Sequence, residues 1–238
     1  MRAARSRRTC EAPAVTVVAC WLRAETIRVD KSIWAVADTR LSTSGTRLLD
    51  EGAKIFPIAV VRREEEGWDI SRRVASETGI GLAYAGSSLV GISTAVAAGA
   101  LLGQLGGVAG SPPTLQELAD FIARIACRYT RRLGLYDPTT KFSALIFGFC
   151  PVARTPGIFR LDFPPLPAEG ERAMATAVDI SDPAAVVLLG SGKQMAAAAV
   201  QRRRGQVPDL SSAWWTAPYY AIEDVIRQAR AANRGDIG

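Results

Sequence analysis

A-V-T-V-V-A-C-W, residues 14 to 21, alternates small residues with valines and predicts a buried β-strand at the start of the fold. The stretch follows a preamble of scattered arginines, and Thr16 stands where that preamble ends. Threonine is β-branched and common in strands, so this residue has an ordinary structural explanation. If everything before Thr16 is removed, however, the chain begins with a threonine that carries a free α-amine. The same residue then becomes a candidate nucleophile.

Residues 1 to 15 form a basic N-terminal extension that admits three origins. The run S-R-R-T-C is loosely similar to a twin-arginine export signal, but the following apolar run is short and no A-x-A cleavage site comes after it. The second origin is a propeptide that is cleaved off. The third is a start codon assigned too far upstream, with translation beginning at Val15. Both of these origins give a chain that begins at Thr16. Because residues 1 to 14 have no periodic pattern, we expect them to be dispensable for folding.

Length and composition predict one globular domain over residues 16–238. The chain has 238 residues, of which 48% are hydrophobic, and this is enough to bury a sizeable core. No stretch of 18 residues is both apolar and free of charge, so the sequence predicts no membrane partner. The net charge of +6 comes from dispersed basic runs with few aromatic residues between them, which argues against a nucleic-acid partner.

The cysteines predict neither a zinc site nor disulfides. They lie far apart and form no C-x-x-C pair, which fits a reducing cytoplasm. We expect each of them to be a core residue or incidental. They are Cys10, Cys20, Cys127 and Cys150.

The most informative feature of the composition is the absence of histidine. It excludes Ser-His-Asp and Cys-His catalysis and histidine-based metal sites. Any general base must therefore be a carboxylate, a lysine, a tyrosinate or a free α-amine. Only four of the 29 basic residues are lysines, and arginine stays protonated at any working pH. G-S-G-K at 190 to 193 is not a phosphate-binding loop, because Val187 and Gln194 replace its first glycine and its hydroxyl residue.

The order of strands and helices predicts the α+β class. Strands are expected over 14–21, 32–38, 54–61, 81–86, 141–149, 157–163 and 184–190, and helices over 88–105, 115–133, from 193 onward and over 219–232. We expect a loop over 39–52 and an insertion over 62–80. Thr114 with Glu117 three residues later predicts a capping box. Strand clusters separated from helix pairs favour sheets with helices on their outer faces.

Without histidine, an N-terminal threonine is the simplest self-sufficient nucleophile, because its own α-amine can accept the proton of its hydroxyl. Such a site needs a nearby lysine, whose positive charge lowers the pKa of the amine and of the hydroxyl, and a carboxylate that holds this lysine. It also needs a backbone N–H, commonly from a glycine at a strand end, to bind the oxyanion.

V-A-D-T-R-L-S at 36 to 42, with Lys54 placed 16 residues after Asp38, resembles motifs of proteasome β-type subunits and their bacterial two-component protease relatives. Y-A-G at 84 to 86 resembles the A-G-G turn of that family, and L-L-G-S-G-K-Q-M resembles its G-S-G helix start. The resemblance extends from Thr16 to the end of the chain. It implies a four-layer αββα sandwich of the N-terminal nucleophile hydrolase type, with two antiparallel sheets between helix layers.

The resemblance also implies a role for each of five residues. Thr16 is the nucleophile, Asp38 orients Lys54, and Lys54 tunes the nucleophile. Gly86 binds the oxyanion through its N–H, and Ser191 is an accessory serine near the amine. Asp38, Lys54 and Gly86 should converge on the start of the strand that Thr16 begins, without metal or cofactor. Ordinary alternatives stay open, namely turn residues, a lysine flanking an edge strand, and a helix N-cap serine.

The chain departs from the family pattern in three places. Thr16 and Asp38 lie 22 residues apart, more than the family norm, which predicts a longer first hairpin through R-A-E-T-I-R-V-D-K. Ala231 and Arg234 stand where the family often has an aspartate and a serine beside the amine. The chain stops at Gly238, where a closing strand is expected, so we expect that strand to be missing.

Two classes of function stay open. One is a cytoplasmic threonine-type hydrolase, a peptidase or another amidohydrolase, from a family that builds homo-oligomeric rings. The other is a catalytically silent structural or interaction subunit whose threonine is never exposed. Cleavage before Thr16 decides between them. The ring size and any partner ATPase leave no trace in the sequence.

Overall fold

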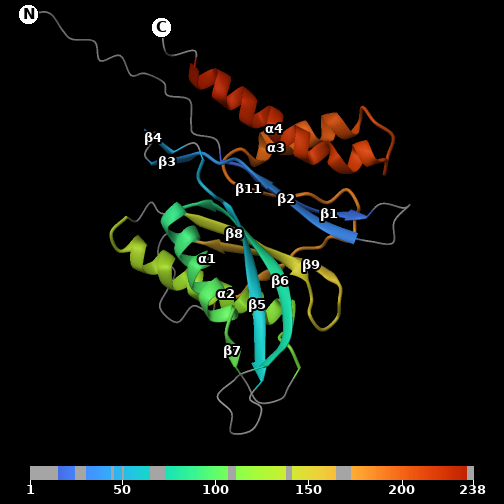
Figure 1. Cartoon of the computed structure of the whole chain (residues 1–238). Helices are drawn as coiled ribbons and strands as arrows, with labels where there is room; N and C mark the ends of the chain where they lie inside the picture. Colours follow the sequence, from blue (N-terminus) through green and yellow to red (C-terminus); the bar gives the residue numbers. More distant parts are fainter. Residues whose placement is uncertain are drawn as a thin grey trace, which may run out of the picture.

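The computed structural model describes residues 16–24, 31–43, 46–49, 51–64, 73–106, 111–137, 141–164 and 173–234 (Figure 1). The predictions on residues 1–15 and on most of the turn between the first two strands lie outside these residues. Within them the chain forms two main sheets, a short hairpin and four helices. The predicted α+β class is confirmed.

Three strands form the smaller sheet, in the order β11-β1-β2. They are β1 (Val18–Ala24), β2 (Lys31–Ala37) and β11 (Val187–Leu189). The central strand β1 is antiparallel to both neighbours, and Trp21 lies opposite Trp34. The strand expected over residues 14–21 therefore exists, but its ladder begins at Val18, so Thr16 lies just before it.

Six strands form the larger sheet, in the order β10-β9-β8-β6-β5-β7. They are β5 (Ile55–Glu64), β6 (Arg73–Gly86), β7 (Leu105–Gly106), β8 (Phe142–Phe149), β9 (Pro156–Phe163) and β10 (Thr176–Ala177). Neighbouring strands are antiparallel except for β5 and β7, which are parallel. β8 and β9 pair along their whole length, as the sequence predicted.

The segment expected to be a loop and the segment expected to be an insertion both contain strands. Residues 39–52 hold a hairpin of β3 (Leu41–Thr43) and β4 (Thr46–Leu49). In the expected insertion over 62–80, β5 continues to Glu64 and β6 begins at Arg73. The expectation of a loop over 39–52 was wrong, whereas the insertion over 62–80 stays a prediction and includes the end of β5 and the first part of β6. Residues 74–79 of β6 are exposed or half-buried on both faces, so the sequence there has no apolar alternation that would predict a strand. Backbone pairing with β5 holds these residues in the sheet instead.

The helices cover the outer faces of the two sheets (Figure 1). They are α1 (Ser88–Leu102), α2 (Leu115–Gly134), α3 (Lys193–Arg204) and α4 (Ser212–Arg234). α1 and α2 contact the larger sheet, whereas α3 and α4 contact the smaller one. The capping box of α2 is confirmed, because the Thr114 hydroxyl accepts from the Glu117 N–H and the Glu117 carboxylate accepts from the Thr114 N–H.

α4 begins at Ser212, earlier than the predicted start at residue 219. Pro218 lies inside the helix, where a residue without a backbone N–H is ordinarily disfavoured. Burial overrides that local preference. Trp214 and Trp215 are both buried, and Trp21 donates its indole N–H to the Trp215 carbonyl at 3.1 Å.

The two sheets face each other across a layer of buried apolar side chains. Val18 and Cys20 of β1 pack there against Ala83 of β6 and Leu145 of β8. Burial raises the pKa of the Cys20 thiol, so this cysteine stays protonated and acts as a small core residue. A second apolar layer lies between the larger sheet and the helices α1 and α2. Among the described helices, none has the length and apolar character needed to cross a bilayer.

Candidate functional site

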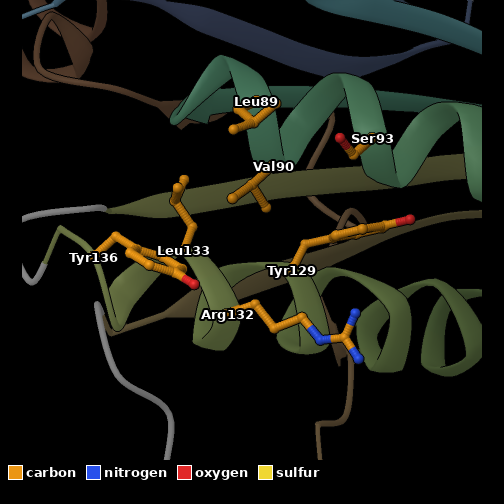
Figure 2. Close-up of a pocket in the computed structure, with 7 residues that line it drawn as sticks. All are labelled: Leu89, Val90, Ser93, Tyr129, Arg132, Leu133 and Tyr136. Carbon is orange, nitrogen blue, oxygen red and sulfur yellow. The ribbon is translucent and has the colours of Figure 1, made fainter.

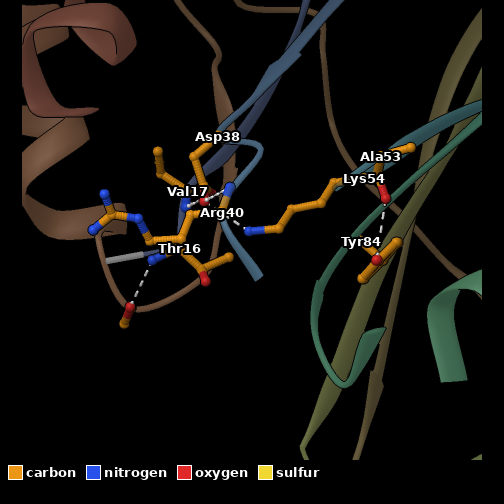
Figure 3. Close-up of polar contacts among 8 residues, drawn as sticks. Thr16, Val17, Asp38, Arg40, Ala53, Lys54 and Tyr84 are labelled. Atoms are coloured by element: carbon orange, nitrogen blue, oxygen red, sulfur yellow. Dashed lines mark hydrogen bonds and ion pairs between the residues drawn. The ribbon is translucent and has the colours of Figure 1, made fainter. Parts of the chain in front are cut away.

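A buried ion pair joins the two sheets where β2 ends and β5 begins (Figure 3). Lys54 donates from Nζ to Asp38 Oδ2 at 2.7 Å, and each residue is only 4% exposed. The carboxylate also accepts from the Val17 N–H at 2.7 Å and from the Arg40 N–H at 3.2 Å. Such extra hydrogen bonds are what a buried ion pair requires. The structure thus brings two of the five predicted site residues into direct contact.

The same aspartate fixes the backbone beside Thr16. Its own N–H donates to the Val17 carbonyl at 3.0 Å, while its Oδ1 accepts from the Val17 N–H. Val17 is therefore held through both of its backbone polar groups. Thr16 precedes it directly and lies at the same corner of the molecule, beside the ion pair (Figure 3).

Ser191 and its glycine neighbours hold Thr16 from the other side. The Thr16 N–H donates to Ser191 Oγ at 3.1 Å, and the Thr16 carbonyl accepts from the Gly192 N–H at 3.0 Å. Ser191 is not the N-cap of α3, because Gly192 occupies that position and no side chain caps the helix there. The G-S-G turn therefore contacts the start of the first strand instead of serving its own helix.

Because Gly190 has no side chain, the Thr16 carbonyl can lie against its Cα. Its φ is +92°, and a Cβ at this position would lie 2.2 Å from the Thr16 carbonyl oxygen. We expect Gly190→Ala to lower the free energy of unfolding by about 2 kcal/mol or more, because the left-handed backbone is strained and the carbonyl cannot move without losing Gly192. Thermal denaturation measures this change. The matched control is Gly79→Ala, whose Cβ would meet nothing within 4 Å, and equal melting temperatures for the two variants would contradict the expectation.

Gly86 ends β6 with a φ of +98°, and a Cβ there would lie 2.1 Å from the Lys141 carbonyl oxygen. The next residue, Ser87, donates its N–H to that same carbonyl and accepts from Val90 as the N-cap of α1. Gly86 is linked to the ion pair through β6, since Ala83 lies opposite Ile55 directly after Lys54. Thr16 bonds Ser191 directly and Lys54 bonds Asp38 directly, and Val17 connects these two pairs. Gly86 is connected to them only through its strand.

Tyr84 is a contact residue of this region that the sequence reasoning missed. Its hydroxyl donates to the Ala53 carbonyl at 3.1 Å, and its backbone N–H donates to the Lys54 carbonyl at 3.1 Å (Figure 3). The only signal for it was its place in Y-A-G, two residues before Gly86. Of the two C-terminal positions compared above, Ala231 is exposed near the end of α4, and the Arg234 side chain lies outside what the structure describes.

An apolar pocket of about 290 Å³ lies between α1 and α2 (Figure 2). It is lined by Leu89, Val90, Ser93, Tyr129, Arg132, Leu133 and Tyr136. None of the five predicted site residues lines it, so the pocket is separate from the candidate site. In the described part of the chain, no cluster of three or more cysteine and carboxylate side chains could hold a metal ion.

No protein-family model and no curated protein matches this chain, but solved structures do. The helical assembly of the Anbu complex from Pseudomonas aeruginosa aligns with a TM-score of 0.59 and 12% identity over 89% of this chain and 75% of that chain. Anbu (ancestral beta-subunit) from Yersinia bercovieri aligns with a TM-score of 0.55 and 10% identity, over 89% of this chain and 75% of that chain. Anbu from Hyphomicrobium sp. strain MC1 aligns with a TM-score of 0.50 and 14% identity, over 79% of this chain and 65% of that chain.

These structures correct the family named from the motifs. Anbu proteins are proteasome-like but form a family distinct from the proteasome β-type subunits and two-component proteases, so that assignment was wrong. The motifs around Asp38 and Lys54 cover too few residues to separate families of one fold. At identities of 10 to 14% the likeness concerns the fold alone, and this chain has an α+β fold like that of the Anbu proteins.

Proposed function

We propose that this chain, once it begins at Thr16, is a threonine-type N-terminal nucleophile hydrolase that cleaves peptide or other amide bonds. The observation that carries the proposal is the buried Asp38–Lys54 ion pair, which is hydrogen-bonded to the backbone directly beside Thr16. Apolar side chains of similar volume often stabilise a core at least as well as a buried ion pair. The pair beside the candidate nucleophile therefore supports a chemical role more than a structural one.

In the proposed reaction, Thr16 Oγ attacks the carbonyl carbon of the scissile amide while the α-amine of the same residue takes the hydroxyl proton. The tetrahedral intermediate collapses when the C–N bond breaks and the leaving amine takes that proton. An ester on Thr16 remains. The α-amine then accepts a proton from water, the resulting hydroxide attacks the ester, and the acid product leaves as the threonine hydroxyl is restored.

The other four residues support this sequence in the proposal. The Lys54 ammonium favours the neutral α-amine and the charge that develops on Thr16 Oγ, and Asp38 holds this ammonium in place. Ser191 Oγ, which bonds the Thr16 nitrogen in the uncleaved chain, would hold the amine after cleavage. Gly86 offers its N–H to the oxyanion from a strand end whose backbone only glycine adopts without strain.

The finer architecture belongs to the same proposal. Two helices on each outer face support a four-layer αββα sandwich within one domain over residues 16–238 (Figure 1).

We extend homo-oligomeric assembly, described for the Pseudomonas protein as helical, to this chain. α1 supports such a contact, because it contains no charged residue and leaves Leu89, Val96 and Leu101 more than half exposed.

The first test reads the N-terminus and the reactivity of Thr16 together. Intact mass and N-terminal sequencing of the natural protein are expected to give Thr16 as the first residue. A β-lactone is expected to label that residue, because an activated hydroxyl opens the strained ring and keeps the whole mass of the reagent. Peptide mass spectrometry locates the added mass.

The same experiment separates the two function classes. A protein that keeps residues 1–15 and takes no label would be a catalytically silent structural or interaction subunit. A label that falls on another hydroxyl, with Thr16 exposed but unmodified, would contradict the assignment of the nucleophile.

A further inference from the structure

We propose that Tyr84 is a positioning residue for Lys54: it binds the carbonyl groups on both sides of the lysine Cα and thereby sets where the ammonium lies. The inference rests on the proposed function for its kinetic consequence but not for its geometry. Tyr84 Oη donates to the Ala53 carbonyl and the Tyr84 N–H donates to the Lys54 carbonyl, each at 3.1 Å (Figure 3). Both peptide planes that flank the Lys54 Cα are thus anchored by one residue.

This anchoring matters because Lys54 lies outside the regular ladder. β5 begins one residue later, at Ile55, and the segment before it is not part of either main sheet. Gly52, further back, is held by its N–H bond to the Thr39 carbonyl at 2.7 Å. The Tyr84 hydroxyl therefore supplies at Ala53 the hydrogen bond that a strand partner would supply elsewhere. The ammonium of a long lysine side chain keeps one position only if the backbone at its Cα is also held in place.

The Tyr84 ring is itself held in a closely fitting slot. The residue is fully buried, and Phe56 and Phe142 lie beside the ring with centroids 6.2 Å away on each side. Gly91 of α1 forms the remaining wall, because a Cβ at that position would lie only 2.5 Å from the ring. This packing restricts movement of the ring and so holds its hydroxyl near Ala53.

The protonation state of the hydroxyl fits this role. Burial raises the pKa of Tyr84, a side-chain hydrogen bond with Ser88 partly offsets this, and the charge of Asp38 raises it further. The phenol therefore stays protonated at neutral pH and remains a hydrogen-bond donor to the Ala53 carbonyl.

Three variants test the inference. Tyr84→Phe keeps the ring and removes only the hydroxyl, whereas Gly91→Ala keeps the hydroxyl and displaces the ring. Each is expected to lower kcat by about tenfold to a hundredfold with KM unchanged, because a displaced catalytic group loses reactivity without losing substrate contacts. Gly99→Ala is the matched control on the same helix, since its Cβ would meet nothing within 4 Å. It is expected to retain the kcat of the parent chain.

A second measurement does not depend on turnover. Acetylation of Lys54 by acetic anhydride, read by mass spectrometry against the exposed Lys141, is expected to rise about tenfold in Tyr84→Phe and in Gly91→Ala. If the parent chain proves inactive, the proposed function fails and this labelling still decides the positioning role. Parent-like labelling in both variants would overturn the inference. With an active parent, so would a parent-like kcat in Tyr84→Phe.

Discussion

Thr16→Ala is expected to abolish turnover of a peptide or amide reporter, with kcat lower by on the order of 10⁴-fold or more, because it removes the attacking oxygen itself. Thr16→Ser should keep partial activity, since a hydroxyl and an α-amine both remain. Lys54→Arg should not restore the activity that Lys54→Ala loses. The planar guanidinium is larger than an ammonium, and the buried site holds Lys54 Nζ against a single carboxylate oxygen.

The assay requires protein whose first residue has been shown to be residue 16 in every variant. The comparison of single and double changes adds a second criterion. Residues that act as one unit give non-additive losses, so Thr16→Ala combined with Lys54→Ala should be no slower than either single variant. Full activity in Thr16→Ala, with the N-terminus verified, would rule out the mechanism proposed above.

Asp38→Ala is expected to cost about 3–5 kcal/mol of folding free energy, because it leaves the Lys54 ammonium buried and without its carboxylate. It also removes the acceptor of the Val17 N–H. Lys54→Met should cost less, since the Asp38 carboxylate would retain its hydrogen bonds from Val17 and Arg40. The double variant should be more stable than the sum of the two losses predicts.

Denaturant unfolding of the three variants measures these differences. Glu223→Ala provides the matched control, because it removes an exposed ion pair with Arg227 on α4 that should contribute well under about 1 kcal/mol. An Asp38→Ala variant as stable as Glu223→Ala would show that the buried pair does not hold the two sheets together at this corner.

Local rules in the sequence predicted much of the fold. The capping box at Thr114 and the paired strands β8 and β9 depend on short-range patterns, and the structure has both. The start of α4 and the first half of β6 depend on tertiary contacts instead. Trp214 and Trp215 bury a helix start that Pro218 disfavours, and β5 pairs with a β6 segment that has no apolar face.

The candidate site divides in the same way. The pairing of Asp38 with Lys54 came from the resemblance to a family motif, and the proposed chemistry also required a carboxylate near a lysine. No sequence pattern indicated the hydrogen bonds of Tyr84 to Ala53 and Lys54. A tyrosine in an apolar strand satisfies a core pattern whether or not its hydroxyl binds a neighbouring carbonyl. The family was named wrongly because short motifs describe a site better than they describe ancestry.

The backbone hydrogen bonds of Thr16 already exist in the uncleaved chain. Its nitrogen meets Ser191, its carbonyl meets Gly192, and Val17 is held by Asp38. Cleavage before Thr16 would therefore alter the electronic character of one atom and leave the shape of the site as it stands. A planar amide nitrogen shares its lone pair with a carbonyl and takes no proton, whereas an amine does. In the proposed enzyme, latency would reside in a single peptide bond, and activation would need no refolding.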